Sequence, residues 1–265
     1  MFQNIKEATL KIVACIKQVP DSAAKVVVEN GRVFWGDAPL VINPWDEFAV
    51  EAALQLKEKH GGTLTVISVG GENEKEAIKH ALAMGADDAI LIADPALSGL
   101  DTQSIAQVLA SAIQKIGGVD VAFFGRQAID SDSGLTPAQT ARLLNWPALT
   151  LAAVISVEAD TIKVDRAIEE GRQVVSAKMP AVVSLVKDYG EPRYPSFMGI
   201  RKAARAEVPV WSLANLGISA PTSVIAWPEI TNPPSRNVVC EIITGSSPEE
   251  IAATLADKIL AEKVL

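Results

Sequence analysis

The sequence predicts an α/β fold, with a doubly wound, mostly parallel sheet, additional antiparallel strands and a C-terminal arm. Three observations predict it. From residue 11 to about residue 149, short apolar runs alternate with amphipathic helical stretches. After Trp146 the pattern changes to strands separated by the short turns AD and EEG. A proline-rich tail then ends in one helical stretch. The alternation of apolar runs and helical stretches implies right-handed crossovers and an open sheet.

The expected parallel strands are short apolar runs, rich in Val, Ile and Phe and continuous rather than alternating. They are KIVACIK (11–17), TLTVISVG (63–70), AILIAD (89–94) and VDVAFFG (119–125). Continuous apolar runs of this length are typical of strands that are buried on both faces of a parallel sheet.

Helical stretches separate these strands, and we expect them at 44–59, 73–85, 101–116 and 136–146. The first begins with Asn43 as N-cap and Pro44 at its first position, with acidic residues in the first turn. Its apolar residues recur every four positions, as in one buried stripe: Phe48, Ala52 and Leu56. The third stretch opens with Asp101, and its inner face carries Ile105, Val108, Leu109 and Ile113.

The remaining segments predict smaller features. Asn30-Gly31 lies between apolar runs and predicts a hairpin. The runs 149–158, 161–168 and 172–186 predict antiparallel strands, either extending the same sheet or forming a small β layer on it. Residues 187–205 have no period and predict a long irregular segment.

In the tail we expect one strand-like run, VVCEII (238–243), and a helix from Ser247 that begins with a capping box. We therefore divide the chain into an α/β domain, 1–218, and a C-terminal arm with its helix, 219–265. The domain includes the antiparallel strands 150–186 and the segment 187–205.

Composition excludes several classes of function. With 265 residues and a net charge of −8, the chain has no basic excess to neutralise nucleic-acid phosphates. No apolar stretch is long enough to span a membrane, and the N-terminus is no signal peptide, so we expect a cytoplasmic or matrix-like protein that is neither secreted nor inserted in a membrane. We expect reduced thiols at Cys15 and Cys240, and solvated surface positions for His60 and His80. These residues provide almost no material for metal or acid–base chemistry, so we expect no metal and no catalytic residue.

The loop after the fourth strand, within FFGRQAIDSDSGLTPAQTARLLNW (123–146), is the candidate binding site. In an open parallel sheet, ligands bind where strands end at the topological switch point. Gly125 permits a close backbone approach, Gly134 is a second permissive position, and Thr136 can cap the next helix before Pro137. Free amides at a helix start suit a nucleotide phosphate. A merely structural loop is the alternative, because the run matches neither GxxxxGKS nor GxGxxG.

Other strand and helix ends could converge on this loop. They are Cys15-Ile16-Lys17, Val69-Gly70-Gly71 and the helix start at Asn43-Pro44. The carboxylates of Asp130 and Asp132 repel phosphate unless they point away or accept bonds from hydroxyls and amides. Ribose hydroxyls, or the backbone of the loop itself, suit them better.

The chain resembles the β subunit of electron-transfer flavoproteins. Its motifs are VACIKQVPD (13–21), NPWDEFAVEAALQLKE (43–58), ALAMGAD (81–87), GRQAIDSD (125–132) and EPRY (191–194), which are specific in combination. The resemblance implies a heterodimer with an α subunit, in which a redox FAD is shared between the subunits. It also implies a sheet of the adenine-nucleotide-binding type, which holds AMP or a second FAD in the β subunit. By motif, the nucleotide contacts fall on Cys15, Asn43, Pro44, Trp45, Asp46, Val69, Gly125, Arg126, Gln127, Ala128, Ile129, Asp130, Ser131, Asp132, Ser133, Gly134, Leu135 and Thr136, and we add Gly70 at the same strand end.

The resemblance also gives segment 187–205 a role in docking acyl-CoA dehydrogenases or related flavoenzymes. Its anchor would be Phe197, flanked by Met198, since a few apolar side chains dominate such contacts. Arg201, Lys202 and Arg205 would steer acidic partners. The alternatives are that Phe197 folds back onto its own domain and that the basic residues form a solvated turn.

Three functions stay open. The first is an electron carrier that acts only as a heterodimer and is no independent catalyst. The second is a subunit of an electron-bifurcating complex in which NADH reduces an FAD bound here; Pro20-Asp21-Ser22 resembles that branch. The third, more remote, is an adenine-nucleotide-binding module without redox chemistry. Electron donor, acceptor and the choice between AMP and FAD are not fixed by the sequence.

Overall fold

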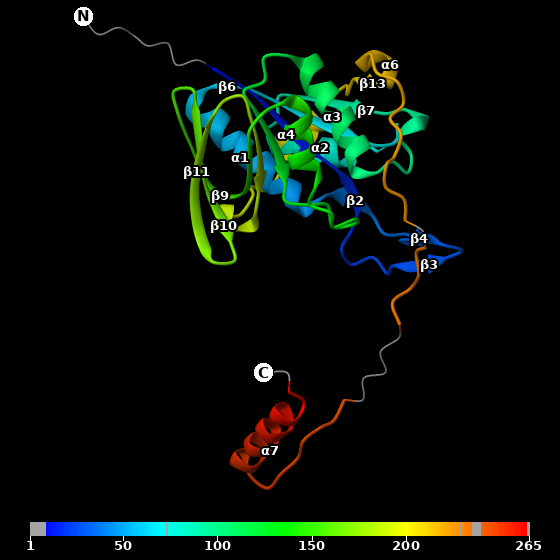
Figure 1. Cartoon of the computed structure of the whole chain (residues 1–265), viewed down its shortest axis with the longest axis vertical. Coiled ribbons are helices and arrows are strands. Elements are labelled where there is room, and N and C mark those ends of the chain that lie inside the picture. The colour runs from blue at the N-terminus through cyan, green and yellow to red at the C-terminus, as the bar shows by residue number, and fades with distance from the viewer. Residues whose placement is uncertain (1–8, 73, 228, 235–239, 264–265) are drawn as a thin grey trace, which may run out of the picture. The chain divides into compact units, whose positions relative to one another are not determined.

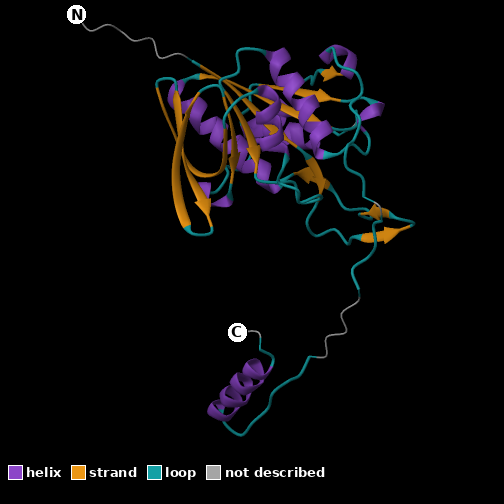
Figure 2. Cartoon of the chain, in the orientation of Figure 1, coloured by secondary structure: helices purple, strands orange, loops and turns teal. Residues whose placement is uncertain are grey.

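The computed structural model describes residues 9–72, 74–227, 229–234 and 240–263. The chain divides into two compact units, Met1–Ile230 and Thr231–Leu265. The first unit holds every strand described below, and the described residues of the second unit contain one helix (Figures 1 and 2).

The first unit is built on a nine-stranded sheet with the order β11-β10-β9-β12-β8-β1-β6-β7-β13. Its strands are β1 (Leu10–Ile16), β6 (Gly62–Val69), β7 (Asp88–Ile92), β8 (Val121–Gly125), β9 (Ala148–Glu158), β10 (Thr161–Ile168), β11 (Gly171–Lys178), β12 (Ala181–Leu185) and β13 (Val210–Trp211). All neighbours from β9 to β13 along this order pair in parallel. The pairs of β10 with β9 and β11 are antiparallel, and Figure 1 shows these strands at the edge opposite β13.

Helices cover both faces of the sheet, as the doubly wound prediction requires. They are α1 (Pro44–His60), α2 (Glu76–Met84), α3 (Thr102–Ile116), α4 (Thr136–Leu144), α5 (Phe197–Ala203) and α6 (Leu213–Leu216), with 3₁₀ turns η1 (Pro95–Leu97) and η2 (Lys187–Tyr189). Two apolar cores result. Residues of α1 and α2 pack with alternate residues of the strands in one core, and residues of α3 and α4 pack in the other. The predicted inner faces are confirmed, except that Phe48 and Ile105 are only partly buried.

The topological switch point lies between β1 and β8. The chain proceeds from β1 to β6 and β7 on one side, then returns to place β8 on the other side of β1. Cys15 of β1 lies at this point, since it pairs with Ile67 of β6 on one side and with Phe124 of β8 on the other. The segments that leave the carboxyl ends of β1 and β8 lead to helices α1 and α4 on opposite faces of the sheet, and ligands of open α/β sheets bind at such a point.

Smaller β elements lie outside the main sheet. Strands β2 (Gln18–Pro20) and β5 (Leu40–Ile42) pair antiparallel, as do β3 (Val27–Glu29) and β4 (Arg32–Phe34). The predicted hairpin turn is confirmed, with positive φ at Asn30 and Gly31.

The run 172–186 was expected to be antiparallel throughout, and this was wrong for its second half. It forms two strands, and β12 inserts in parallel between β8 and β9. The physical reason is burial: all five residues of β12 are buried, whereas β11 is mostly exposed at the sheet edge. The antiparallel strands extend the main sheet and form no separate layer.

Two further expectations differ. The segment 187–205 is not wholly irregular, since it contains η2 and α5. Cys240, Glu241, Ile242 and Ile243 are not in a strand; residues 238 and 239 of that expected run lie outside the described residues, as does residue 73 at the expected start of the second helix.

The predicted C-terminal helix is confirmed as α7 (Pro248–Ala261). Ser247 Oγ accepts the amide of Glu250, but the carboxylate of Glu250 accepts the amide of Ser246, so the capping box is formed only in part. Among the described residues, the helices lack the combination of length and apolarity needed to cross a membrane.

Candidate functional site

A buried carboxyl group joins the two strand ends at the switch point. Asp46 lies in the first turn of α1 and is 6% exposed. Its Oδ2 accepts the amide of Lys17, just after β1, at 2.8 Å, and its Oδ1 accepts the amide of Gly125, at the end of β8, at 3.2 Å. Asp46 thus fixes α1 against both strands at the point where their loops diverge.

Asn43 holds the loop that follows β8. Its Nδ2 donates to the carbonyl of Gln127 at 2.8 Å, and its Oδ1 accepts the amide of Ile129 at 3.2 Å. Asn43 occupies the N-cap position of α1, as expected, but its side chain makes no cap hydrogen bond. The prediction of a side-chain cap was therefore wrong, because the loop takes both polar atoms of the amide.

The acidic residues of the loop are engaged in its own structure. Asp130 Oδ2 accepts Nζ of Lys17 at 2.6 Å, which bridges the loops after β1 and β8. Asp132 accepts a short hydrogen bond from Nε2 of Gln127, and its own amide donates to the carbonyl of Ala128 at 2.8 Å. The repulsion that these carboxylates would exert on a phosphate is reduced by these partners.

Gly125 is required by the close approach of α1. A Cβ at this position would lie 2.4 Å from Oδ1 of Asp46 and 2.6 Å from the backbone carbon of Trp45. Real Cβ atoms essentially never approach so closely, so no side chain fits between β8 and α1 here. This glycine contributes to the site by admitting Asp46.

The second half of the loop faces solvent and leads into α4. Residues 131–135 are exposed, and Gly134 has a φ of +63°, the left-handed conformation that favours glycine. Thr136 was expected to cap α4, but Leu135 occupies the cap position and no side chain caps the helix. Backbone amides at the start of α4 are therefore left to other partners.

Trp45 and Arg126 form one wall of the site. The Arg126 guanidinium lies 5.6 Å from the centre of the Trp45 ring, and the Trp45 and Phe48 ring centres are 6.3 Å apart. Arg126 is exposed and Trp45 is partly buried, so the stack borders solvent.

The predicted residues on β1 and β6 lie on the far side of the switch point from the loop. Cys15 is buried, and burial, followed by the charge of Asp46, raises the pKa of its thiol. Val69 and Gly70 are half-buried at the end of β6. The carboxylate of Glu74 lies against this end, since a Cβ on Gly70 would be 2.6 Å from its Oε2. The backbone at Gly70-Gly71 is therefore covered by one flexible side chain.

A nucleotide fits the donors and acceptors present. Oδ1 of Asp130 is buried and has no hydrogen-bond partner among the described residues, so it can accept from a hydroxyl or an amine. The uncapped start of α4 supplies amides for an anion. The described part of the chain has no group of three or more potential metal ligands, so a metal site is not indicated.

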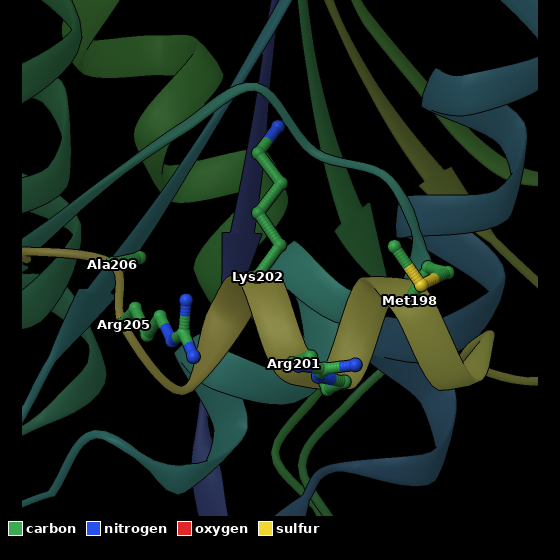
Figure 3. A pocket seen from close by; sticks show the side chains of 5 residues that line it. All are labelled: Met198, Arg201, Lys202, Arg205 and Ala206. Atoms are coloured by element: carbon green, nitrogen blue, oxygen red, sulfur yellow. The ribbon is translucent and has the colours of Figure 1, made fainter.

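The expected docking residues lie apart from this site, on α5. Phe197 is 73% exposed and Met198 70% exposed, so neither folds back onto the domain. Arg201 lies over the Phe197 ring, 6.0 Å from its centre. A groove of about 530 Å³ follows the helix, lined by Met198, Arg201, Lys202, Arg205 and Ala206 (Figure 3).

Two residues with structural roles were not predicted as such: Lys17 was expected only as a strand end, and Arg193 had no predicted role. Lys17 provides both an amide to Asp46 and an ammonium to Asp130. Its position one residue after an apolar strand, in a loop expected to reach the switch point, was the available signal. Both His60 and His80 are partly buried and not fully solvated as expected, and Nε2 of His80 lies 2.8 Å from Oε1 of Glu47.

Fold and site together define a doubly wound α/β protein with a candidate ligand site at the β1/β8 switch point. A sequence profile described as electron transfer flavoprotein domain matches residues 36–216. The chain is 36% identical over 258 residues to the electron transfer flavoprotein subunit beta of Thermoanaerobacterium thermosaccharolyticum, covering 91% of this chain and 95% of the relative. The chain therefore belongs to the electron transfer flavoprotein family, with its β subunits.

Two other relatives have different names. Subunit CarD of the caffeyl-CoA reductase-Etf complex of Acetobacterium woodii is 33% identical over 266 residues, covering 97% of this chain and all of the relative. Protein FixA of Azorhizobium caulinodans is 36% identical over 217 residues, covering 79% of this chain and 77% of the relative.

Proposed function

We propose that this chain is the β subunit of a heterodimeric electron-transfer flavoprotein and holds an adenine nucleotide at the β1/β8 switch point. The observation that carries the proposal is the loop 125–136, which Asn43, Asp46 and Lys17 fix from three directions. A loop held in this way presents its backbone without reorganisation when a ligand arrives, which favours binding. Family membership supports the redox role.

Different residues of the site contact different parts of the nucleotide. Amides at the uncapped start of α4 would hold the phosphate, and Oδ1 of Asp130 would accept a ribose hydroxyl. Arg126, which stacks on Trp45, would border the nucleotide on the side that faces solvent. The flavin itself supplies the electron-transfer chemistry when bound, so this subunit needs no acid or base and only has to bind and orient. The redox FAD is shared with the α subunit, which completes the electron path between dehydrogenases and the acceptor.

The nucleotide held by this subunit is AMP or a second FAD. A second flavin ring would extend toward Gly70-Gly71, where it would have to displace the carboxylate of Glu74. AMP needs no such movement. The similarity to CarD, which belongs to a reductase-Etf complex, is the observation that favours the second candidate, a bifurcating complex in which NADH reduces an FAD bound here.

A nucleotide count tests both candidates. The protein is purified with its partner subunit, denatured, and the released FAD and AMP are measured per heterodimer. One FAD and one AMP, with no bleaching by NADH, identify the simple carrier. Two FAD and direct reduction by NADH identify the bifurcating complex. A preparation that retains a redox FAD but no nucleotide attributable to this subunit would contradict the proposed site.

We further propose that Phe197 and Met198 dock a partner flavoenzyme, with Arg201 steering it. Phe197→Ala removes a large exposed apolar anchor, and a hot-spot loss of about 2 kcal/mol corresponds to a roughly thirtyfold weaker complex. Electron transfer to the partner should slow at sub-saturating concentration while flavin content and absorption spectrum stay unchanged. Phe34→Ala, at an exposed aromatic residue of the β3–β4 hairpin, is the matched control. Loss of flavin with normal docking would reverse the assignment.

A further inference from the structure

The segment around α5 exposes apolar side chains yet is held firmly in place. Tyr194 is 93% exposed and Ile200 52% exposed, in addition to Phe197 and Met198. A helix of seven residues is not stable by itself in water, because nucleation costs more than so few hydrogen bonds return. Contacts elsewhere must therefore fix this segment.

The first anchor is Arg193, which precedes the exposed residues and lies against α1. Its Nε donates to Oε2 of Glu51 at 2.8 Å, and its Nη2 donates to Oε1 at 3.1 Å, a bidentate pair. Its Nη1 and Nη2 also reach the two carboxylate oxygens of Glu58, at 2.5 and 3.1 Å. The backbone amide of Arg193 donates to Glu51 as well, at 3.1 Å, so both side chain and main chain are fixed.

Glu51 is the buried half of this anchor, with 4% of its surface exposed. Burial alone would raise the pKa of Glu51, but the hydrogen bonds from Arg193 and Gln55 outweigh it and the pKa is lowered. Gln55 in turn accepts from the hydroxyl of Tyr189 at 3.0 Å. With this many hydrogen-bond partners, the buried carboxylate of Glu51 is held in one orientation. It therefore fixes the chain at Tyr189 and at Arg193, on either side of residue 190.

The second anchor is Gly199, which lies against the end of α2. A Cβ at this position would be 2.2 Å from the carbonyl oxygen of Ala83, so α5 and α2 touch through backbone. Ser196 caps α5 by accepting the amide of Gly199 at 2.9 Å, and Ala203 is buried on the same side. The exposed residues thus project from a helix whose other face is fixed.

We propose that Arg193 is the positioning residue that holds segment 190–205 in its docking conformation before a partner binds. This inference rests on the proposed docking function of Phe197. The surface presents an apolar crest beside the three cations Arg201, Lys202 and Arg205, and Figure 3 shows Met198 near the start of α5 and Arg205 just past its end. The fitting partner is a flavoenzyme with an apolar pocket bordered by carboxylates. Because the surface is already ordered, binding costs little conformational entropy.

Hydrogen exchange of the purified flavoprotein, without partner, tests the preformed state. The amides of Ile200 and Ala204, which donate within α5, should be protected before any partner is added. Arg193→Gln should accelerate their exchange and raise the KM for the partner flavoenzyme about tenfold, less than the loss of the Phe197 anchor itself, with kcat at saturation unchanged. Arg193→Lys, which keeps the charge, should restore part of the KM.

Two variants separate positioning from general loss of structure. Arg172→Gln removes another arginine–carboxylate pair of the same region, with the exposed Asp188, and should change neither exchange nor KM. Phe197→Ala should raise KM without changing exchange in α5. Amides that become protected only on adding the partner, or an unchanged KM in Arg193→Gln beside a raised KM in Phe197→Ala, would overturn the inference. An unchanged KM in Phe197→Ala would instead refute the proposed docking role, whatever the exchange shows.

Discussion

Gly125→Val is expected to abolish nucleotide retention and to destabilise the protein by about 3 kcal/mol, roughly 10 °C in melting temperature. The valine Cβ would enter the space of the Asp46 carboxylate and the Trp45 backbone, at 2.4 and 2.6 Å. These neighbours are backbone and a fully buried group, and neither can move without separating α1 from β8. The loop 125–136 would then lose both its start and the Asn43 contacts. Thermal unfolding and nucleotide content of the purified flavoprotein measure the effect.

Gly134→Ala is the matched control for this change. Gly134 has a positive φ, but the nearest atom to its Cβ, the carbonyl oxygen of Arg126, is 3.6 Å away. Alanine there costs only backbone strain, about 1 kcal/mol, and should leave most of the nucleotide bound. A Gly125→Val protein that kept its full nucleotide complement would refute the assignment of the site to this strand end.

Asp46→Ala should cost about 3 kcal/mol at pH 5 and weaken nucleotide binding. The change leaves the buried amides of Lys17 and Gly125 without an acceptor, and each unsatisfied group costs roughly 1–3 kcal/mol. Asp46→Asn should cost less, because the amide oxygen can still accept one of the two bonds. Melting curves of the variants, compared with their nucleotide content, measure whether strand ends and ligand are coupled through this residue.

The cost of Asp46→Ala should become smaller as pH rises. Burial raises the pKa of Asp46 from 3.8 to about 7, although bonds from the amide of Lys17, from Asn43 and from the amide of Gly125 act to lower it. Between pH 3.8 and about pH 7 the unfolded chain releases the Asp46 proton while the folded chain keeps it. The free energy of unfolding therefore falls as the pH rises through this range. The loss is complete above pH 7 and reaches roughly 4 kcal/mol. Below the lower value both states are protonated and the contribution is fully present.

The pH dependence can be isolated by difference. Among the described Asp and Glu residues, the others with a resolved change have lowered pKa values, for example Asp101 at about 2, so they stay ionised between pH 5 and 8. The melting temperature of the parent protein minus that of Asp46→Asn should therefore decrease from pH 5 to 8. A difference that is flat or rises over this range would show that Asp46 is ionised in the folded protein throughout.

Much of the fold followed from local pattern. Continuous apolar runs predicted β1, β6, β7 and β8 because a strand buried on both faces needs no polar alternation. The capping-box pattern that begins at Ser247 likewise predicted the last helix. The short motifs, among them GRQAIDSD, identified the family, which the profile over residues 36–216 confirms.

Local sequence pattern did not predict the elements whose placement depends on packing against distant segments. The five residues of β12 were assigned to the antiparallel run before them, because only their insertion between β8 and β9 distinguishes them. Helix α5 gave no period in the sequence, since its short length is stabilised by the backbone of α2 and not by an apolar stripe of its own.

The sequence by itself determined the four parallel strands β1, β6, β7 and β8, the helices between them, the family and the loop on which the candidate site is built. Only the tertiary structure decided how that loop is held. Asn43 was expected to cap its helix, and it instead bonds Gln127, 84 residues further on. Lys17 and Asp130, separated by 113 residues, meet because β1 and β8 are neighbours in the sheet. Such contacts depend on strand order, which hydrophobic burial fixes across the whole domain, and no local spacing encodes it.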